Sequence, residues 1–86
     1  MRAWYYSRGR LNVVPGEHFG VVAAVYRGKV RVRYHEDSDT LAVQARSLNL
    51  CRQAVKAVLD RTDVHPEKIC AEWPGQYREV FLSDWK

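Results

Sequence analysis

The stretch GVVAAVYRGKVRVRY, residues 20–34, changes its pattern halfway along. Its first half is almost continuously apolar, whereas its second half carries a cation at every second position. Strict alternation is typical of a β-strand with one face in the core and the other outside. The dipeptide Arg27-Gly28 suits a two-residue hairpin loop, because Gly accepts a positive φ. The stretch therefore predicts a β-hairpin that joins residues 19–26 to residues 29–34.

The register of this hairpin sorts its side chains onto two faces, because neighbours along a strand point to opposite sides. A four-residue turn, Glu36–Asp39, leads to another strand, TLAVQAR, that continues both faces. The expected core face comprises Val21, Ala23, Val25, Val30, Val32, Tyr34, Leu41, Val43 and Ala45. The expected outer face includes Tyr26, Lys29, Arg31, Arg33, Gln44 and Arg46.

Aromatic residues and turn residues predict the secondary structure at the beginning of the chain. RAWYYS, residues 2–7, is rich in aromatic residues and favours a first strand. The following RGRLNVVPGEH, residues 8–18, is rich in turn residues and favours an irregular connection. The first half of the chain is therefore expected to be entirely β.

The second half begins with a change of period. Apolar residues recur at every third or fourth position over residues 50–62, which predicts a helix capped by Ser47 or Asn49. After the helix, KICAEW and REVFLSDW predict two strands around a Pro-Gly turn. The expected order is four strands, one helix and two strands, in a single domain, 1–86.

The strand and turn pattern of residues 19–48 resembles the SH3-like small β-barrels of the Tudor and KOW type. The resemblance rests on a Gly before an apolar strand, a Val-x-Val-x-aromatic strand, an acidic turn and a last strand closing on Leu48. It implies a mainly β (α+β) fold, an SH3-like antiparallel barrel with one helix and an additional C-terminal β-hairpin. Barrels of this superfamily bind nucleic acid, peptides or partner subunits, so the resemblance implies a binding module. No residue of an aromatic cage is carried over from it.

Composition and charge narrow the class of protein. The 86 residues carry a net charge of +4, and residues 1–50 hold all of the excess, with eight Lys/Arg against four Asp/Glu (8 − 4 = +4). The apolar fraction of 47% is that of an ordinary globular protein. The longest apolar run is much shorter than the ~20 residues of a membrane span, and the first residues lack the apolar core of a signal peptide. We therefore expect a cytoplasmic protein that does not bind or span a membrane.

The cations of the outer face are the candidate nucleic-acid-binding residues. Several Lys and Arg on one surface can hold phosphates, and an aromatic ring among them can stack on a base. The set is Tyr26, Lys29, Arg31, Arg33, Gln44 and Arg46. The alternatives are a solvated sheet face and neutralisation by the adjacent acidic turn of Glu36, Asp37 and Asp39.

Aromatic residues near both ends of the chain are the candidate interface. Three consecutive aromatic residues of one strand cannot all point into the core, so at least one is expected at the surface or against a partner. The candidate interface residues are Trp4, Tyr5, Tyr6 and Trp85. They favour a second hypothesis, a protein-interaction or structural module that acts as a homodimer or accessory subunit. The alternative is that these residues belong to the core and its rim.

Catalysis is not predicted. The three histidines are scattered, and the two cysteines, Cys51 and Cys70, form neither a zinc-ligand pattern nor a disulfide framework. No phosphate-binding, dinucleotide-binding or nucleophile-elbow motif is found. We therefore expect a non-enzymatic protein with no metal and no cofactor, whose partner is nucleic acid, itself or another protein.

Overall fold

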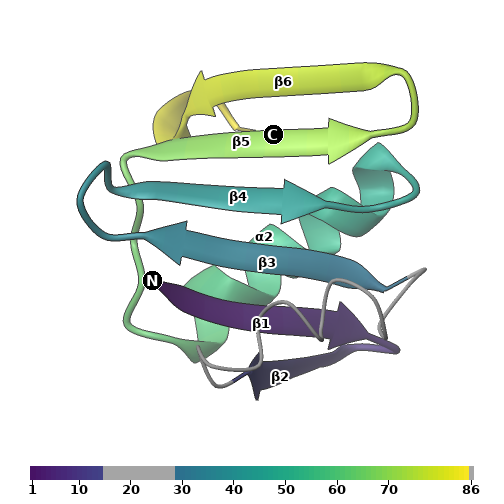
Figure 1. Ribbon diagram of the computed structural model, residues 1–86, viewed down its shortest axis with the longest axis horizontal. Coiled ribbons are helices and arrows are strands. Elements are labelled where there is room, and N and C mark those ends of the chain that lie inside the picture. Colours follow the sequence, from purple (N-terminus) through teal and green to yellow (C-terminus); the bar gives the residue numbers. More distant parts are fainter. Residues whose placement is uncertain (15–28, 86) are drawn as a thin grey trace.

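The computed structural model describes residues 1–14 and 29–85, which form one six-stranded sheet with a helix on one face (Figure 1). The described residues form strands and helices in the following order along the chain. They are β1 (Arg2–Ser7), β2 (Arg10–Val14), β3 (Val30–His35), β4 (Thr40–Gln44), α2 (Leu48–Arg61), β5 (Lys68–Trp73), β6 (Gln76–Phe81) and the short 3-10 helix η2 (Leu82–Asp84).

The strand order across the sheet is β2-β1-β3-β4-β5-β6. All neighbouring pairs are antiparallel except β4 and β5, which are parallel because α2 connects them across one face. The prediction of a mainly β, α+β fold with one helix is confirmed for the described residues. Over these residues β2 and β6 lie at opposite ends of an open sheet (Figure 1), so the barrel is not closed and the likeness to SH3-like barrels stays a prediction.

The expected hairpin of β3 and β4 is confirmed in register and in loop length. Val32 pairs with Val43 and Arg31 pairs with Gln44, and the loop runs from Glu36 to Asp39. The expected first strand of the other hairpin, residues 19–26, lies outside the described residues. On that side of β3 the structure places β1.

The helix α2 begins and ends close to its predicted bounds. Ser47 is the N-cap residue, and its side chain accepts a hydrogen bond of 3.2 Å from the backbone N–H of Leu50. At the other end the Thr62 hydroxyl donates to the carbonyl of Val58 (2.8 Å). The buried stripe of Cys51, Ala54, Val55, Ala57 and Val58 faces the sheet.

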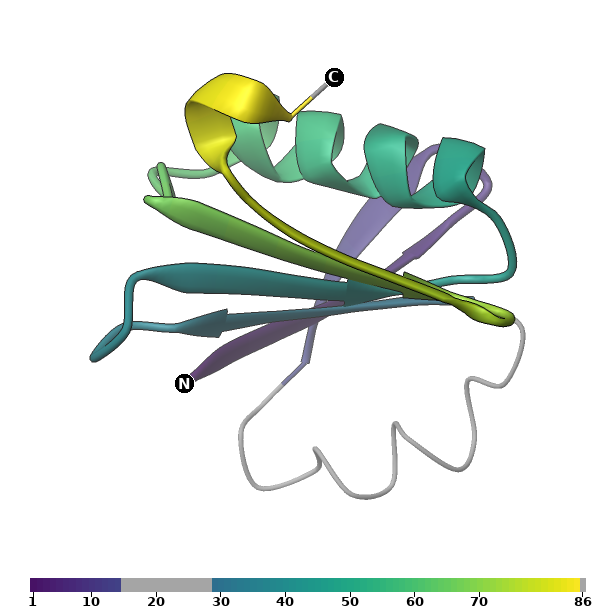
Figure 2. The same cartoon turned by 90° about the horizontal axis from the view of Figure 1, so that it is seen from above.

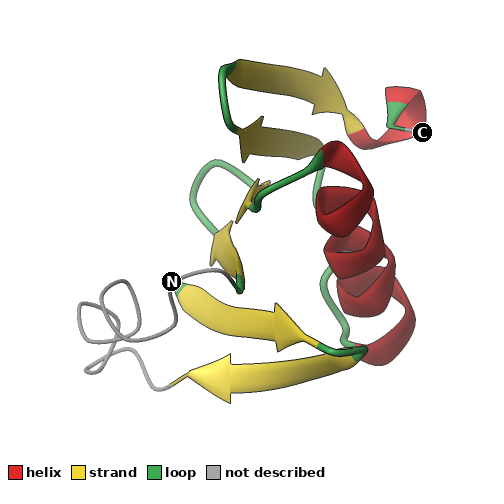
Figure 3. Ribbon diagram, turned by 90° about the vertical axis from the view of Figure 1, so that its right-hand side faces the viewer, coloured by secondary structure: helices red, strands yellow, loops and turns green. Residues whose placement is uncertain are grey.

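Figures 2 and 3 show α2 lying along one face of the sheet, which we call the helix face. The core fills the space between them, and its most buried side chains include Val32, Leu41, Ile69 and Val58, none of them accessible. Burying apolar side chains at roughly 25 cal/mol per Å² is the main stabilising contribution to such a layer. No helix within the described part of the chain is long and apolar enough to cross a membrane.

Strand β2 lies where the sequence predicted an irregular connection. It forms a hairpin with β1 through Arg8 and Gly9, both of which have positive φ (51° and 77°). Two positive φ angles in a two-residue loop are the signature of a type I′ turn, whose twist matches the strands. Arg8 and Gly9, which sequence analysis placed in an irregular connection, therefore form a tight hairpin turn.

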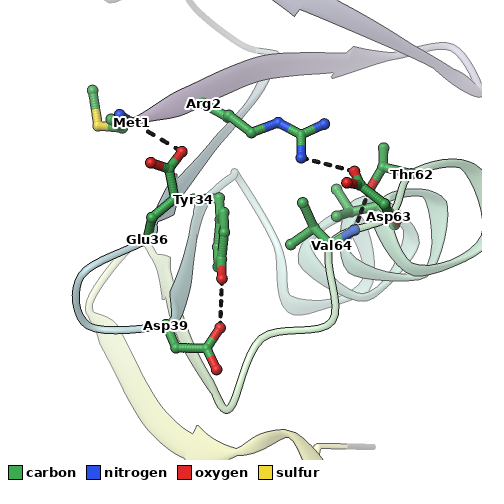
Figure 4. Close-up of polar contacts among 9 residues, drawn as sticks. Met1, Arg2, Tyr34, Glu36, Asp39, Thr62, Asp63 and Val64 are labelled. Carbon is green, nitrogen blue, oxygen red and sulfur yellow. Dashed lines mark hydrogen bonds and ion pairs between the residues drawn. The ribbon is translucent and has the colours of Figure 1, made fainter.

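Polar contacts join the start of β1 to segments distant in sequence (Figure 4). The amino terminus lies 3.8 Å from the carboxylate of Glu36, in the β3–β4 turn. Arg2 Nη1 donates to Asp63 Oδ1 (2.8 Å), just after α2. In the same turn as Glu36, Asp39 accepts a hydrogen bond from the hydroxyl of Tyr34.

Candidate functional site

The sheet face opposite α2, here called the second face, carries the cations of β3. Arg31 and Arg33 alternate with the buried valines of that strand, so both point away from the core. Lys29 directly precedes the strand, and its Nζ lies 5.0 Å from the ring centre of Tyr5 on β1. Tyr5 pairs with Arg31 in register. We call Lys29, Arg31 and Arg33 the basic cluster.

Burial and neighbouring charges act on the guanidinium of Arg33. The pKa of Arg33 is lowered, first by partial burial of its guanidinium and then by the positive charge of Arg31, while the Glu72 carboxylate acts in the opposite direction. Arg31 Nη1 also donates to Gln44 Oε1 at 3.0 Å. The cluster is therefore a half-buried concentration of positive charge.

The register of the strands places one row of side chains straight across the second face. Each residue of this row pairs with the next on the neighbouring strand. From β1 to β6 the row consists of Tyr5, Arg31, Gln44, Glu72 and Tyr77. The face is thus polarised along this row, with cations on β3 and carboxylates on β5 and β6, while Lys68 at the start of β5 adds a cation to the same face.

The carboxylate of Glu79 on β6 joins two groups of the second face. Tyr77 donates its hydroxyl proton to Glu79 Oε2 (3.0 Å), and the thiol of Cys70 lies 3.5 Å from the same oxygen. Cys70 and Glu79 raise the pKa of Tyr77, which keeps the phenol protonated. Burial raises the pKa of the Cys70 thiol. Tyr77 and Cys70 are therefore held in their neutral forms, and neither is an activated nucleophile.

A pocket of about 490 Å³ opens at the end of β4 and β5, next to this row. Glu72 and Tyr77 of the row line it together with Gln44, and the β5–β6 turn completes its wall. Its full lining is Gln44, Ala45, Glu72, Trp73, Pro74, Gly75, Gln76 and Tyr77. The volume lies within the range of small-ligand sites.

The structure brings together four of the six predicted nucleic-acid-binding residues. Lys29, Arg31, Arg33 and Gln44 belong to the second face, as their register predicts. Arg46 is exposed but follows the last paired residue of β4. Tyr26 lies outside the described residues.

Sequence reasoning did not assign Tyr5, Glu72 and Tyr77 to this face as partners of the basic cluster. Alternation along β1 could have placed Tyr5 opposite the buried Trp4 and Tyr6. The positions of Glu72 and Tyr77 depend on the parallel pairing of β4 with β5, which joins segments separated by a whole helix. No local sequence pattern predicts a pairing between strands so far apart in the chain.

The structure separates the four predicted interface residues. Trp4 and Tyr6 are 2% and 8% exposed and pack in the core, so within this chain they follow the alternative of core residues rather than the candidate interface. Alternation turns them toward α2, and β1 lies inside the sheet rather than at an edge. Tyr5 is half-buried on the second face, and Trp85 is half-buried against the core.

Among residues 1–14 and 29–85, no group of three His, Cys, Asp or Glu side chains is placed to hold a metal ion. Comparisons of the chain with protein-family models, with curated proteins and with solved structures found no match. The function is therefore argued from the second face itself.

Proposed function

We propose that the chain is a small, non-enzymatic binding module that holds nucleic acid through the basic cluster, with Gln44 and Arg46 beside it. One observation carries this proposal. Arg31 and Arg33 of β3 and Lys29, which directly precedes this strand, meet on one face of the sheet, and the charge of Arg31 contributes to lowering the pKa of Arg33. A phosphate placed between them would relieve this repulsion, and charge-assisted bonds from guanidinium to phosphate are among the strong ones.

The contacts of the acidic turn support the proposal. Glu36 lies near the amino terminus, and Asp39 accepts from Tyr34, whose ring packs against the core on the helix face. Two of the three carboxylates of this turn are thus engaged away from the basic cluster. Neutralisation of the cluster by its neighbouring turn, the alternative drawn from the sequence, is correspondingly less favoured.

Charge reversal in the basic cluster, compared with charge reversal on the exposed side of α2, tests the proposal. The full chain is titrated with a fluorescent mixed-sequence oligonucleotide at low salt, and the double variant Arg31→Glu, Arg33→Glu is compared with Arg52→Glu, Lys56→Glu. The control pair changes the net charge equally but lies exposed on α2, away from the second face. We expect the first variant to lose at least about tenfold in affinity and the control to lose much less. Equal losses, or no binding by the parent chain, would contradict the proposal.

A second candidate function rests on the edge strand β6. Tyr77 and Phe81 are 63% and 51% exposed there, on a strand with one unpaired edge among the described residues. Exposed apolar edge strands invite pairing with another chain, which would make the protein a homodimer or an accessory subunit. Sedimentation equilibrium tests it: a dimer that Phe81→Lys converts to a monomer would support this function, and a parent chain that is monomeric at high concentration would oppose self-association.

A further inference from the structure

The acidic and aromatic residues of the second face, Glu72 on β5 and Tyr77 and Glu79 on β6, indicate which form of nucleic acid would fit this face. We propose that the chain selects single strands, with phosphates on the basic cluster and an unstacked base in the pocket at the end of β4 and β5. This inference rests on the proposed function and deepens it. It depends on the pocket, on the row of side chains that crosses the sheet, and on the distribution of charge.

The pocket adjoins the basic cluster through a shared side chain. Gln44 lines the pocket and also accepts the hydrogen bond from Arg31 Nη1. Because neighbouring strands are about 4.8 Å apart, Arg31 on β3 lies two strands, or roughly 10 Å, from Glu72 on β5. A short single strand can therefore place a phosphate on Arg31 and a neighbouring base in the pocket at the same time.

The walls of the pocket suit a planar base with polar edges. Tyr77 presents an exposed ring, and its hydroxyl donates to Glu79 Oε2. Stacking on such a ring accepts any base. Gln44 and Gln76 carry both donors and acceptors, and the Glu72 carboxylate accepts from an exocyclic amino group. Trp73 also lines the pocket, and the Arg78 guanidinium lies 5.6 Å from its ring centre.

The charges of the second face disfavour a duplex. A duplex presents phosphates along its whole surface, so one that lay on the basic cluster and extended over the ends of β5 and β6 next to the pocket would bring phosphates to Glu72 and Glu79, whereas Lys68 lies at the other end of β5. A single strand can turn its bases toward these carboxylates and its phosphates toward Arg31 and Arg33. Repulsion on one side and attraction on the other therefore set both the preference for single strands and the direction in which a bound strand lies.

Three probes and three variants test this inference. The full chain is titrated with a mixed-sequence DNA single strand, with the same strand annealed to its complement, and with inorganic polyphosphate. The variants are Tyr77→Ala, Tyr77→Phe and Phe81→Ala. Phe81 is the matched control, because it is an exposed aromatic residue on the same strand and the same face but does not line the pocket. Circular dichroism establishes that each variant is folded.

We expect the single strand to bind at least about tenfold more tightly than the duplex. Tyr77→Ala should weaken single-strand binding about 5- to 100-fold, as loss of one stacked base does, while polyphosphate binding is unchanged. Tyr77→Phe keeps the ring and should bind nearly as the parent does, and so should Phe81→Ala. Equal binding of single strand and duplex, or equal effects of Tyr77→Ala and Phe81→Ala, would overturn the inference. If both forms of DNA still bind and charge reversal at Arg31 and Arg33 abolishes binding, the proposed function stands without it.

Discussion

The two faces of the sheet differ in what their side chains contact, although the same strands supply both. On the helix face, Val32, Leu41 and Ile69 are inaccessible and pack against α2. On the second face, the residues next to them in sequence are Arg31, Arg33, Thr40, Ala42, Lys68 and Cys70. Strand β3 shows the difference at its sharpest, because alternate residues of one short segment form the core and the basic cluster. The alternation that specifies the fold therefore also gathers the candidate site.

The largest expected effect comes from placing the same charge on either face of β3. Val32→Asp buries a carboxylate at a position with no accessible surface and should lower the free energy of unfolding by at least about 3 kcal/mol. Arg31→Asp changes the second face and should cost about 1 kcal/mol, mainly through loss of the hydrogen bond to Gln44. Urea denaturation of both variants measures the difference. Similar losses would mean that the two faces are not distinguished by burial.

The two cysteines provide a smaller and independent comparison of the faces. Cys51 is inaccessible between α2 and the sheet, whereas Cys70 is partly exposed on the second face. A thiol reagent should modify Cys70 in the native protein at least about 100-fold faster than Cys51, which reacts only when the core opens. The rates are measured in the Cys51→Ala and Cys70→Ser variants. Comparable native rates would contradict the packing of α2 on the helix face.

The smallest expected effect concerns acid stability at the exposed contact between Arg2 and Asp63. The hydrogen bond from Arg2 holds the pKa of Asp63 below its usual value. A carboxyl with a lowered pKa in the folded state stabilises the fold above its unfolded pKa, and this stabilisation is lost as pH falls through the folded pKa. Asp63→Asn should therefore lose less stability than the parent between about pH 4 and pH 2. Thermal unfolding across this range measures it, and parallel pH profiles would show that the contact contributes nothing.

The elements with strong local patterns could be predicted from the sequence. The register of β3 with β4 follows from alternation and a four-residue turn, and α2 follows from its apolar stripe and the Ser47 cap. Strand β2 was missed because Gly9 and Pro15 made its surroundings resemble a loop. Trp4 and Tyr6 were named as candidate interface residues because composition does not show that β1 lies between two other strands, with these side chains toward α2.

The candidate site could be predicted only on its basic side. Lys29, Arg31, Arg33 and Gln44 lie on one local hairpin, so their common face follows from alternation. Glu72 joins them through the parallel pairing of β4 and β5, which is set by the packing of α2 on the sheet. Pairing between distant segments depends on tertiary contacts, and for this reason neither the pocket nor the polarity of the second face was foreseen.

The salt dependence of binding tests the central claim, that the basic cluster of the second face holds phosphates, most directly. With about four cations engaged, the three of the cluster and Arg46, a plot of log affinity against log salt for a DNA single strand should have a slope of roughly −3. Arg31→Ala and Arg33→Ala should each make this slope less steep by about one unit, whereas Lys56→Ala on α2 should leave it unchanged. A slope near zero, or a slope that Arg31→Ala and Arg33→Ala leave as steep as that of the parent, would contradict the claim.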